Sequence, residues 1–134
     1  MDVFRIGLIG AGSIGTRHIK AIDELADIDL AAIADPSPGA AALGASRGIP
    51  VFADADSMLC ETDIEAVIVA TPTERHHADV MTALSHRRTV LVEKPITATM
   101  TEAAEVTRYA AEQGCQVLVG HQRRYYPCAA AARE

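Results

Sequence analysis

The stretch that decides the fold is Phe4-Arg5-Ile6-Gly7-Leu8-Ile9-Gly10-Ala11-Gly12-Ser13-Ile14-Gly15. Its first half is nearly continuous in apolar residues, which is typical of a strand that is buried on both faces. Its second half has the pattern G-x-G-x-x-G. An amphipathic helix is expected over residues 13–26 directly after it, with Leu25 on the apolar stripe. A glycine turn without a ligand is the simplest alternative. The strand before the glycines and the helix after them favour a phosphate-binding loop instead.

Each glycine of this loop has an expected structural role. Gly10 permits a tight turn, Gly12 leaves room for a pyrophosphate against the backbone, and Gly15 lets the helix pack closely on the sheet. The free N–H groups at the start of the helix then favour an anion. The residues that we assign to this loop, together with the three glycines, are Ala11, Ser13 and Ile14.

The rest of the chain alternates between apolar runs and helical periodicity. Further strands are expected at 30–34, 66–70, 90–92 and 116–119, each nearly continuous in apolar residues like a strand that is buried on both faces, and a weaker one at 50–52. Further helices are expected at 37–48, 74–86 and 101–112, and Thr99-x-x-Glu102 at the start of the last has the form of a capping box. Strict alternation requires right-handed crossovers and a parallel sheet that has helices on both faces. The sequence therefore predicts an α/β fold with one doubly wound, six-stranded Rossmann domain, in the strand order 3-2-1-4-5-6.

Asp35 is the residue that we expect to bind the ribose hydroxyls of the cofactor. It lies 20 residues after Gly15, at the end of the second strand. A carboxylate there accepts hydrogen bonds from the ribose hydroxyls and repels a 2′-phosphate. No arginine occurs in residues 36–39, which follow it. These features predict NAD as the cofactor, in preference to NADP.

Three polar clusters follow the next three strands, at the edge where the carboxyl ends of parallel strands meet. The clusters are Thr71-Pro72 with His76, then Glu93-Lys94-Pro95, and then Gly120 with Arg123-Arg124-Tyr125. We expect them to converge on one crevice beside the dinucleotide. The candidate cofactor-binding residues there include Thr71, Pro72, Glu93, Lys94 and Pro95. A lysine beside the nicotinamide can orient a substrate hydroxyl and take part in proton transfer, so Lys94 is the candidate catalytic residue.

At these residues the chain resembles the glucose–fructose oxidoreductase, inositol dehydrogenase and rhizopine catabolism family, abbreviated Gfo/Idh/MocA. The resemblance covers essentially the whole chain, and Glu93-Lys94-Pro95 after an apolar strand is its most specific part. It implies an NAD-dependent dehydrogenase that transfers hydride between nicotinamide and a secondary alcohol of a sugar, inositol or related polyol. It also implies a larger second α/β domain that carries most substrate contacts and the interface of a homo-oligomer.

The resemblance extends to individual positions. It implies a cis Lys94–Pro95 bond and cofactor-side roles for His76 and Arg124. For His76 a helix-capping or packing role is an equal alternative, and for Arg124 a structural ion pair is the alternative. We assign residues 1–121 to the NAD-binding domain and residues 122–134 to the start of a link toward the second domain, which this sequence does not contain.

Composition excludes several classes of protein. The 134 residues include 12 Lys and Arg and 18 Asp and Glu, so the net charge is −6, and no basic run offers a footprint for nucleic acid. No apolar stretch approaches the ~20 residues that cross a bilayer. The three cysteines have no C-x-x-C spacing, and no His/Glu spacing matches a zinc motif. We therefore expect a cytoplasmic protein without a metal.

Two other functions remain open from the residues themselves. The first is a non-catalytic NAD-binding sensor or regulatory module, for which a lysine at the nicotinamide end has no purpose. The second is another enzyme with a similar first domain, such as a biliverdin reductase-like or dihydrodipicolinate reductase-like protein. Arg123-Arg124-Tyr125 fits the polyol group better.

Overall fold

The computed structural model describes residues 3–132, which form a single six-stranded parallel sheet flanked by helices. The strands are β1 (Phe4–Ile9), β2 (Ile28–Ala34), β3 (Val51–Phe52), β4 (Ala66–Val69), β5 (Thr89–Glu93) and β6 (Val117–Gly120). Their order is β3-β2-β1-β4-β5-β6, and every neighbouring pair is parallel. The predicted fold class and strand order are confirmed.

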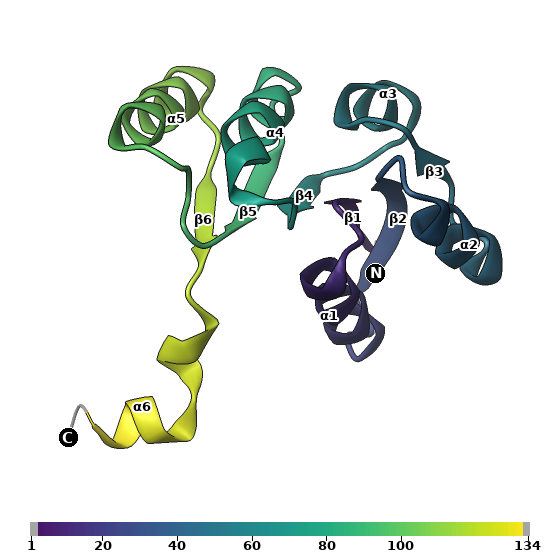
Figure 1. Cartoon of the computed structure of the whole chain (residues 1–134), viewed down its shortest axis with the longest axis horizontal. Helices are drawn as coiled ribbons and strands as arrows, with labels where there is room; N and C mark the ends of the chain where they lie inside the picture. The colour runs from purple at the N-terminus through teal and green to yellow at the C-terminus, as the bar shows by residue number, and fades with distance from the viewer. Residues whose placement is uncertain (1–2, 133–134) are drawn as a thin grey trace.

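The helices cover the sheet from both sides (Figure 1). They are α1 (Ser13–Asp23), α2 (Pro38–Arg47), α3 (Ala55–Glu61), α4 (Thr73–Ser85), α5 (Met100–Gln113) and α6 (Pro127–Ala131), with a 3-10 turn, η1, at Gln122–Tyr125. In Figure 1, α3, α4 and α5 lie on one face of the sheet, and α1 and α2 lie on the other. The segment after β6 runs away from both layers.

Two apolar cores result, one on each face of the sheet. The core beneath α3, α4 and α5 includes Met58, Leu84 and Val106, which are fully buried. The core beneath α1 and α2 includes Ile19 and Ile33. The central strands β1 and β4 contribute to both cores because successive side chains of a strand point to opposite faces. The continuous apolar runs of the sequence reflect this burial on both faces.

Local signals set several helix ends where the sequence places them. Thr99 and Glu102 form the expected capping box of α5, in which each side chain accepts a hydrogen bond from the other residue's backbone N–H. Gly48 and Gly114 end α2 and α5 in the left-handed conformation that glycine adopts readily.

Two details of the sequence prediction are wrong. The first helix ends at Asp23 rather than at residue 26, because the chain tightens there and Leu25 N–H bonds to Ile22 C=O. Leu25, expected on the buried stripe, is consequently 49% exposed. The last strand is not buried on both faces: it lies at the edge of the sheet and leaves Leu118 55% exposed.

Candidate functional site

The glycine loop joins β1 to α1 in the middle of the sheet, and its backbone is too crowded for side chains at two positions. Gly10 has a φ of 91°, and a Cβ there would lie 2.8 Å from the backbone nitrogen of Thr71. A Cβ on Gly15 would lie only 2.1 Å from the carbonyl oxygen of Gly10. These two glycines therefore have the roles expected of them, a turn and a close helix packing.

Gly12 is different, because a Cβ built on it meets no atom within 4 Å. Its glycine therefore leaves open space in front of the backbone rather than relieving a clash. Gly12 is also the N-cap of α1 and supplies no capping side chain, whereas Ser37 caps the first turn of α2. The first N–H groups of α1, at Ser13 and Ile14, have no carbonyl partner within the helix. The loop therefore fits a pyrophosphate in shape and in charge.

The Asp35 carboxylate lies beside the same loop at the end of β2. Its Oδ2 accepts the N–H of Ala11 and its Oδ1 accepts the N–H of Ser37, both at 2.8 Å. Burial raises the pKa of Asp35, but the hydrogen bonds from Ser37 and Ala11 and the nearby charge of Arg75 outweigh burial, so that the pKa lies below its usual value of 3.8. The carboxylate therefore stays ionised near neutral pH and keeps lone pairs that can accept bonds from a diol.

The crevice at the carboxyl edge of the sheet contains two cavities that meet at Thr71 and Pro72. The cavity beside Asp35 has a volume of about 260 Å³ and is lined also by Gly10, Gly12, Asp54 and Arg75, among others. The cavity on the other side has a volume of about 350 Å³ and is lined also by Ile14, Arg17, His76, Glu93, Lys94 and Arg123, among others. Together they form a continuous site whose two ends are marked by Asp35 and Lys94.

Lys94 directly follows β5, and its exposed side chain lines the larger crevice cavity. The Lys94–Pro95 peptide bond is cis, as the resemblance implied. The preceding residue, Glu93, is held from the other side of the sheet: its Oε1 accepts a hydrogen bond from Nε2 of His18, on α1, at 2.8 Å. His18, which had no function assigned from the sequence, thereby joins α1 to the strand end that carries Lys94.

His76 lies beneath the crevice and connects its two walls. Its side chain is 1% exposed. Nδ1 lies 2.8 Å from the carbonyl oxygen of Pro95, and Nε2 lies 2.9 Å from that of Thr71. Carbonyl oxygens only accept, so the ring donates to one of them when neutral and to both when protonated. Of the two alternatives that the sequence left open, these contacts favour the packing role.

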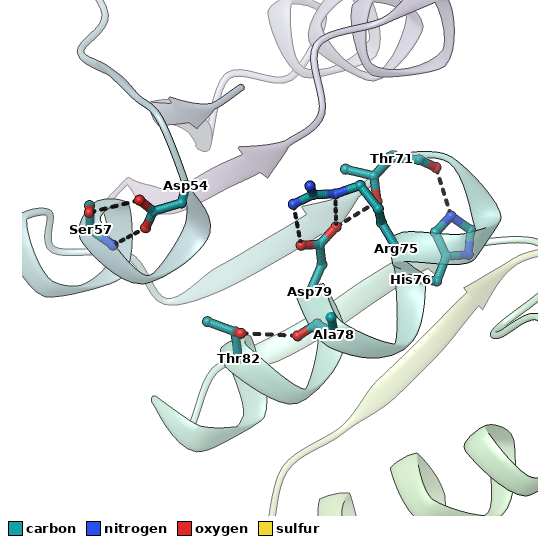
Figure 2. A network of polar contacts seen from close by, with 8 residues as sticks. All are labelled: Asp54, Ser57, Thr71, Arg75, His76, Ala78, Asp79 and Thr82. Atoms are coloured by element: carbon teal, nitrogen blue, oxygen red, sulfur yellow. Dashed lines mark hydrogen bonds and ion pairs between the residues drawn. The ribbon is translucent and has the colours of Figure 1, made fainter. Parts of the chain in front are cut away.

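Arg75 enters the cavity beside Asp35 from the first turn of α4, and the sequence did not single it out. Figure 2 shows its guanidinium against the carboxylate of Asp79, one turn further along the helix. Nη2 of Arg75 lies 3.1 Å from Oδ1 of Asp79, whose Oδ2 also accepts the hydroxyl of Thr71 at 2.7 Å. Asp79 is 6% exposed whereas Arg75 is 60% exposed. A buried carboxylate thus orients an arginine at the rim of the cavity.

The two arginines after β6 line the crevice differently, because Arg123 lines two neighbouring cavities and Arg124 lines one of them. Arg123 lines the larger crevice cavity. Arg124, which was assigned to the nicotinamide ribose, lines a neighbouring cavity of about 130 Å³ together with Lys94. No local signal distinguishes these adjacent arginines in the sequence, because the direction of each side chain depends on the 3-10 turn that carries them.

A doubly wound parallel sheet with an open glycine loop at its centre and a carboxylate at the end of β2 defines a dinucleotide-binding Rossmann domain. The comparisons with known proteins narrow this class. A family model described as "Oxidoreductase family, NAD-binding Rossmann fold" matches residues 4–121. The chain belongs to this family, the Gfo/Idh/MocA oxidoreductases, and is an NAD-binding domain of that family.

Individual relatives agree with this assignment. The chain is 32% identical over 127 residues to the rhizopine catabolism protein MocA of Rhizobium meliloti, covering 95% of this chain and 40% of that protein. It is 34% identical over 132 residues to an inositol 2-dehydrogenase of Rhizobium meliloti strain 1021, covering 97% of this chain and 39% of that enzyme.

Among solved structures, scyllo-inositol dehydrogenase from Lactobacillus casei with bound NAD(H) and scyllo-inositol superposes with a TM-score of 0.91. The sequence identity is 25%, and the match covers 98% of this chain and 40% of that enzyme. The chain therefore spans about 40% of the length of these relatives.

Proposed function

We propose that this chain is the cofactor-binding domain of an NAD-dependent dehydrogenase that acts on a secondary alcohol of an inositol, a sugar or a related polyol. The observation that carries the proposal is the position of Lys94, which shares one cavity with Thr71 and Pro72 and lies in the same crevice as the glycine loop. A module that only bound NAD would have no use for an amine at this end of the crevice. The relatives named inositol 2-dehydrogenase support the substrate class.

In this reaction the bound cofactor and the residues around Lys94 have different roles. Bound NAD supplies the hydride acceptor. Lys94 orients the substrate hydroxyl and takes part in the transfer of its proton, so that the alcohol, after losing a hydride to NAD and a proton, leaves as a ketone. Glu93, fixed by His18, and the loop residues Thr71 and Pro72 hold the nicotinamide end in register with Lys94.

Cofactor preference follows from Asp35. Its carboxylate accepts from the ribose diol through charge-assisted hydrogen bonds worth roughly 1.5–3 kcal/mol, and it repels a 2′-phosphate. Arg75 lines the same cavity, but its charge is balanced by Asp79. We therefore expect NAD to bind at least about tenfold more tightly than NADP, which corresponds to about 1.4 kcal/mol.

Isothermal titration of the chain with NAD⁺ and NADP⁺ tests the cofactor assignment. Asp35→Ala removes the diol contact and the repulsion together, so the affinity for NAD⁺ should fall and the gap between the cofactors should narrow. Asp54→Ala is the matched control, because Asp54, the N-cap residue of α3, lines the same cavity and the substitution should leave the preference for NAD⁺ intact. Equal affinities of the unchanged chain for both cofactors would contradict the role of Asp35.

The catalytic assignment needs a substrate-binding half. By itself the chain should bind NAD⁺ but reduce it at no useful rate with any polyol, because substrate orientation accounts for several kcal/mol of a barrier. Joined to the remaining part of the related inositol 2-dehydrogenase, it should form NADH from inositol. There, Lys94→Met should lower kcat about 100-fold or more while NAD⁺ affinity changes little. Lys20→Met, on the exposed face of α1, is the control.

A chimera that binds NAD⁺ normally but produces the same NADH with and without Lys94 would overturn the catalytic role. A chimera that binds NAD⁺ and turns over no polyol would favour the sensor module instead.

The proposal also covers the organisation of the whole protein. It includes a domain boundary at residue 121, a second domain beyond it and the formation of a homo-oligomer. We place the protein in the cytoplasm, which agrees with three cysteines that all remain free. Within residues 3–132, no helix is long and apolar enough to cross a membrane.

A further inference from the structure

Outside the crevice, three side chains that can bind metals meet between α3 and α4. Asp56 and Cys60 belong to α3, and His86 is the C-cap residue of α4. One ligand atom from each, a carboxylate oxygen, the thiol sulfur and an imidazole nitrogen, lies within 4.8 Å of the other two. Nε2 of His86 is already 2.8 Å from Oδ1 of Asp56. None of the three lines a cavity of the crevice, so the cluster is separate from the cofactor site.

The positions of the three residues follow from their helices. Asp56 and Cys60 are four residues apart, which places both on one face of α3, one turn from each other. Asp54 caps this helix by accepting the N–H of Ser57 at 2.8 Å, which orders the turn that contains Asp56. α3 and α4 lie side by side over the same face of the sheet (Figure 1), so the end of α4 brings His86 to this face of α3.

The three side chains differ in how exposed they are to solvent. The His86 side chain is 23% exposed and is therefore held between the helices, whereas that of Asp56 is 71% exposed and Cys60 is also exposed. A cation at this point would have its protein ligands on one side and solvent on the other. That arrangement leaves a fourth position for water.

The ligand types select the cation. Zn²⁺ binds thiolate sulfur, imidazole nitrogen and carboxylate oxygen, and it commonly takes three protein ligands and a water. Ca²⁺ and Mg²⁺ take oxygen ligands, so a thiol excludes them. A tetrahedral zinc ion holds its ligand atoms roughly 3.3–3.6 Å apart, which small rotations of these side chains achieve. We propose that Asp56, Cys60 and His86 form a zinc site that ties α3 to α4.

Cys60 distinguishes this proposal from an ordinary surface contact between a histidine and a carboxylate. His86 and Asp56 form such a hydrogen-bonded pair without a metal, and an exposed pair of this kind adds little to stability. The chain contains a close comparison in His77 of α4, whose Nε2 lies 3.0 Å from Oε2 of Glu105 on α5. That pair joins two helices in the same way, but it is not part of a cluster of three ligands among the described residues.

Titration of the reduced chain with Co²⁺, followed by displacement with Zn²⁺, tests the site. We expect one equivalent of Co²⁺ to produce a thiolate-to-cobalt charge-transfer band and the intense visible bands of a tetrahedral ion. Cys60→Ser should abolish the charge-transfer band, and His86→Gln should weaken binding at least tenfold. Cys128→Ser, Cys115→Ser and His77→Gln are matched controls that should leave the spectrum and the affinity unchanged.

Thermal unfolding gives an independent measurement, because a ligand of the native state raises Tm. Zn²⁺ at about a hundredfold excess over its Kd should raise Tm by roughly 5 °C or more in the unchanged chain and in His77→Gln. It should have no such effect in Cys60→Ser or His86→Gln. The absence of a thiolate band in the unchanged chain, or the same band and affinity after Cys60→Ser, would overturn the proposal. Because NAD⁺ titration reports on the crevice alone, the cofactor proposal and the zinc proposal are tested independently of each other.

Discussion

At the scale of single residues, two glycines of the loop lack a side chain for different reasons. Gly15 is required by the protein itself, since its Cβ would be driven into the carbonyl oxygen of Gly10. Gly12 is not required by the protein, since a Cβ there would project into open space. We propose that a ligand in this space is the reason for the second glycine, and mutation can tell the two positions apart.

Gly15→Ala should lower the free energy of unfolding by about 2 kcal/mol or more, although alanine is the better helix former by about 1 kcal/mol. Gly12→Ala should change that free energy by less than about 1 kcal/mol, yet weaken NAD⁺ binding at least about tenfold. Urea unfolding and calorimetric titration measure the two quantities. Similar losses of stability in both variants would show that the space before Gly12 is needed for folding rather than for the ligand.

Asp35 makes the loop sensitive to acid. Because its folded pKa lies below 3.8, its ionised form adds stability that is fully present above that pH and is lost as the pH falls through the lowered pKa. Asp35→Asn, which cannot accept both backbone N–H groups, should be less stable than the unchanged chain at pH 7. The difference should shrink as the pH drops below about 4. Urea unfolding at several pH values measures it, and a difference independent of pH would contradict this account.

At the scale of elements, buried or half-buried histidines hold together segments that are far apart in the chain. His18 joins α1 to the end of β5 through Glu93. His76 joins the loop after β4 to the loop after β5 through two carbonyl oxygens. These contacts set the distance between the walls of the crevice, so the shape of the site depends on side chains beneath it as well as on those that line it.

His76→Ala should lower the free energy of unfolding by about 2–4 kcal/mol, because it leaves a cavity and deprives at least one buried carbonyl group of its hydrogen-bond donor. His77→Ala, next to it on α4 and paired with Glu105 near the surface, should cost less than about 1 kcal/mol. Chemical denaturation of both variants gives the comparison. Equal costs would mean that the ring of His76 contributes no more than a surface ion pair.

At the scale of the whole molecule, the sheet is covered unevenly. α4 and α5 pack over the face of β5 and β6 on one side, whereas in Figure 1 no helix of residues 3–132 lies over these strands on the side of α1. A cavity of about 510 Å³ lies there, lined by Leu91, Leu118, Tyr125 and others. The side chains of Leu118 and Tyr125 are 55% and 86% exposed, so the surface beside β6 is markedly apolar.

An apolar surface of this kind promotes association. We expect the chain to self-associate as its concentration rises, and the double substitution Leu118→Lys and Tyr125→Ser should reduce that association at least about fivefold in Kd, or by about 1 kcal/mol. Light scattering and sedimentation over a range of concentrations measure it. Leu25→Lys, which replaces an exposed leucine at the end of α1, is the control. A monomer at all concentrations would show that this surface does not drive assembly.

The sequence by itself determined the elements and their order in the sheet, and it predicted which residues lie at the two ends of the candidate site. Strands, helix caps and the glycine loop are patterns within a few residues, and a glycine loop after the first strand is typical of the doubly wound order 3-2-1-4-5-6. Asp35 and Lys94 could be placed because residues at strand ends meet at one edge of a parallel sheet. The same reasoning failed for Leu118, because local pattern does not reveal which face of an edge strand is left uncovered.

Only the tertiary structure decided which side chains meet across elements. The spacing between His18 and Glu93, between His76 and Pro95, or between Cys60 and His86 follows no local rule. Each contact depends on how a helix is rotated about its axis and on how far it is shifted along its neighbour. Those two quantities are set by the packing of the whole core, and a difference of one residue in either would turn the side chain to another face.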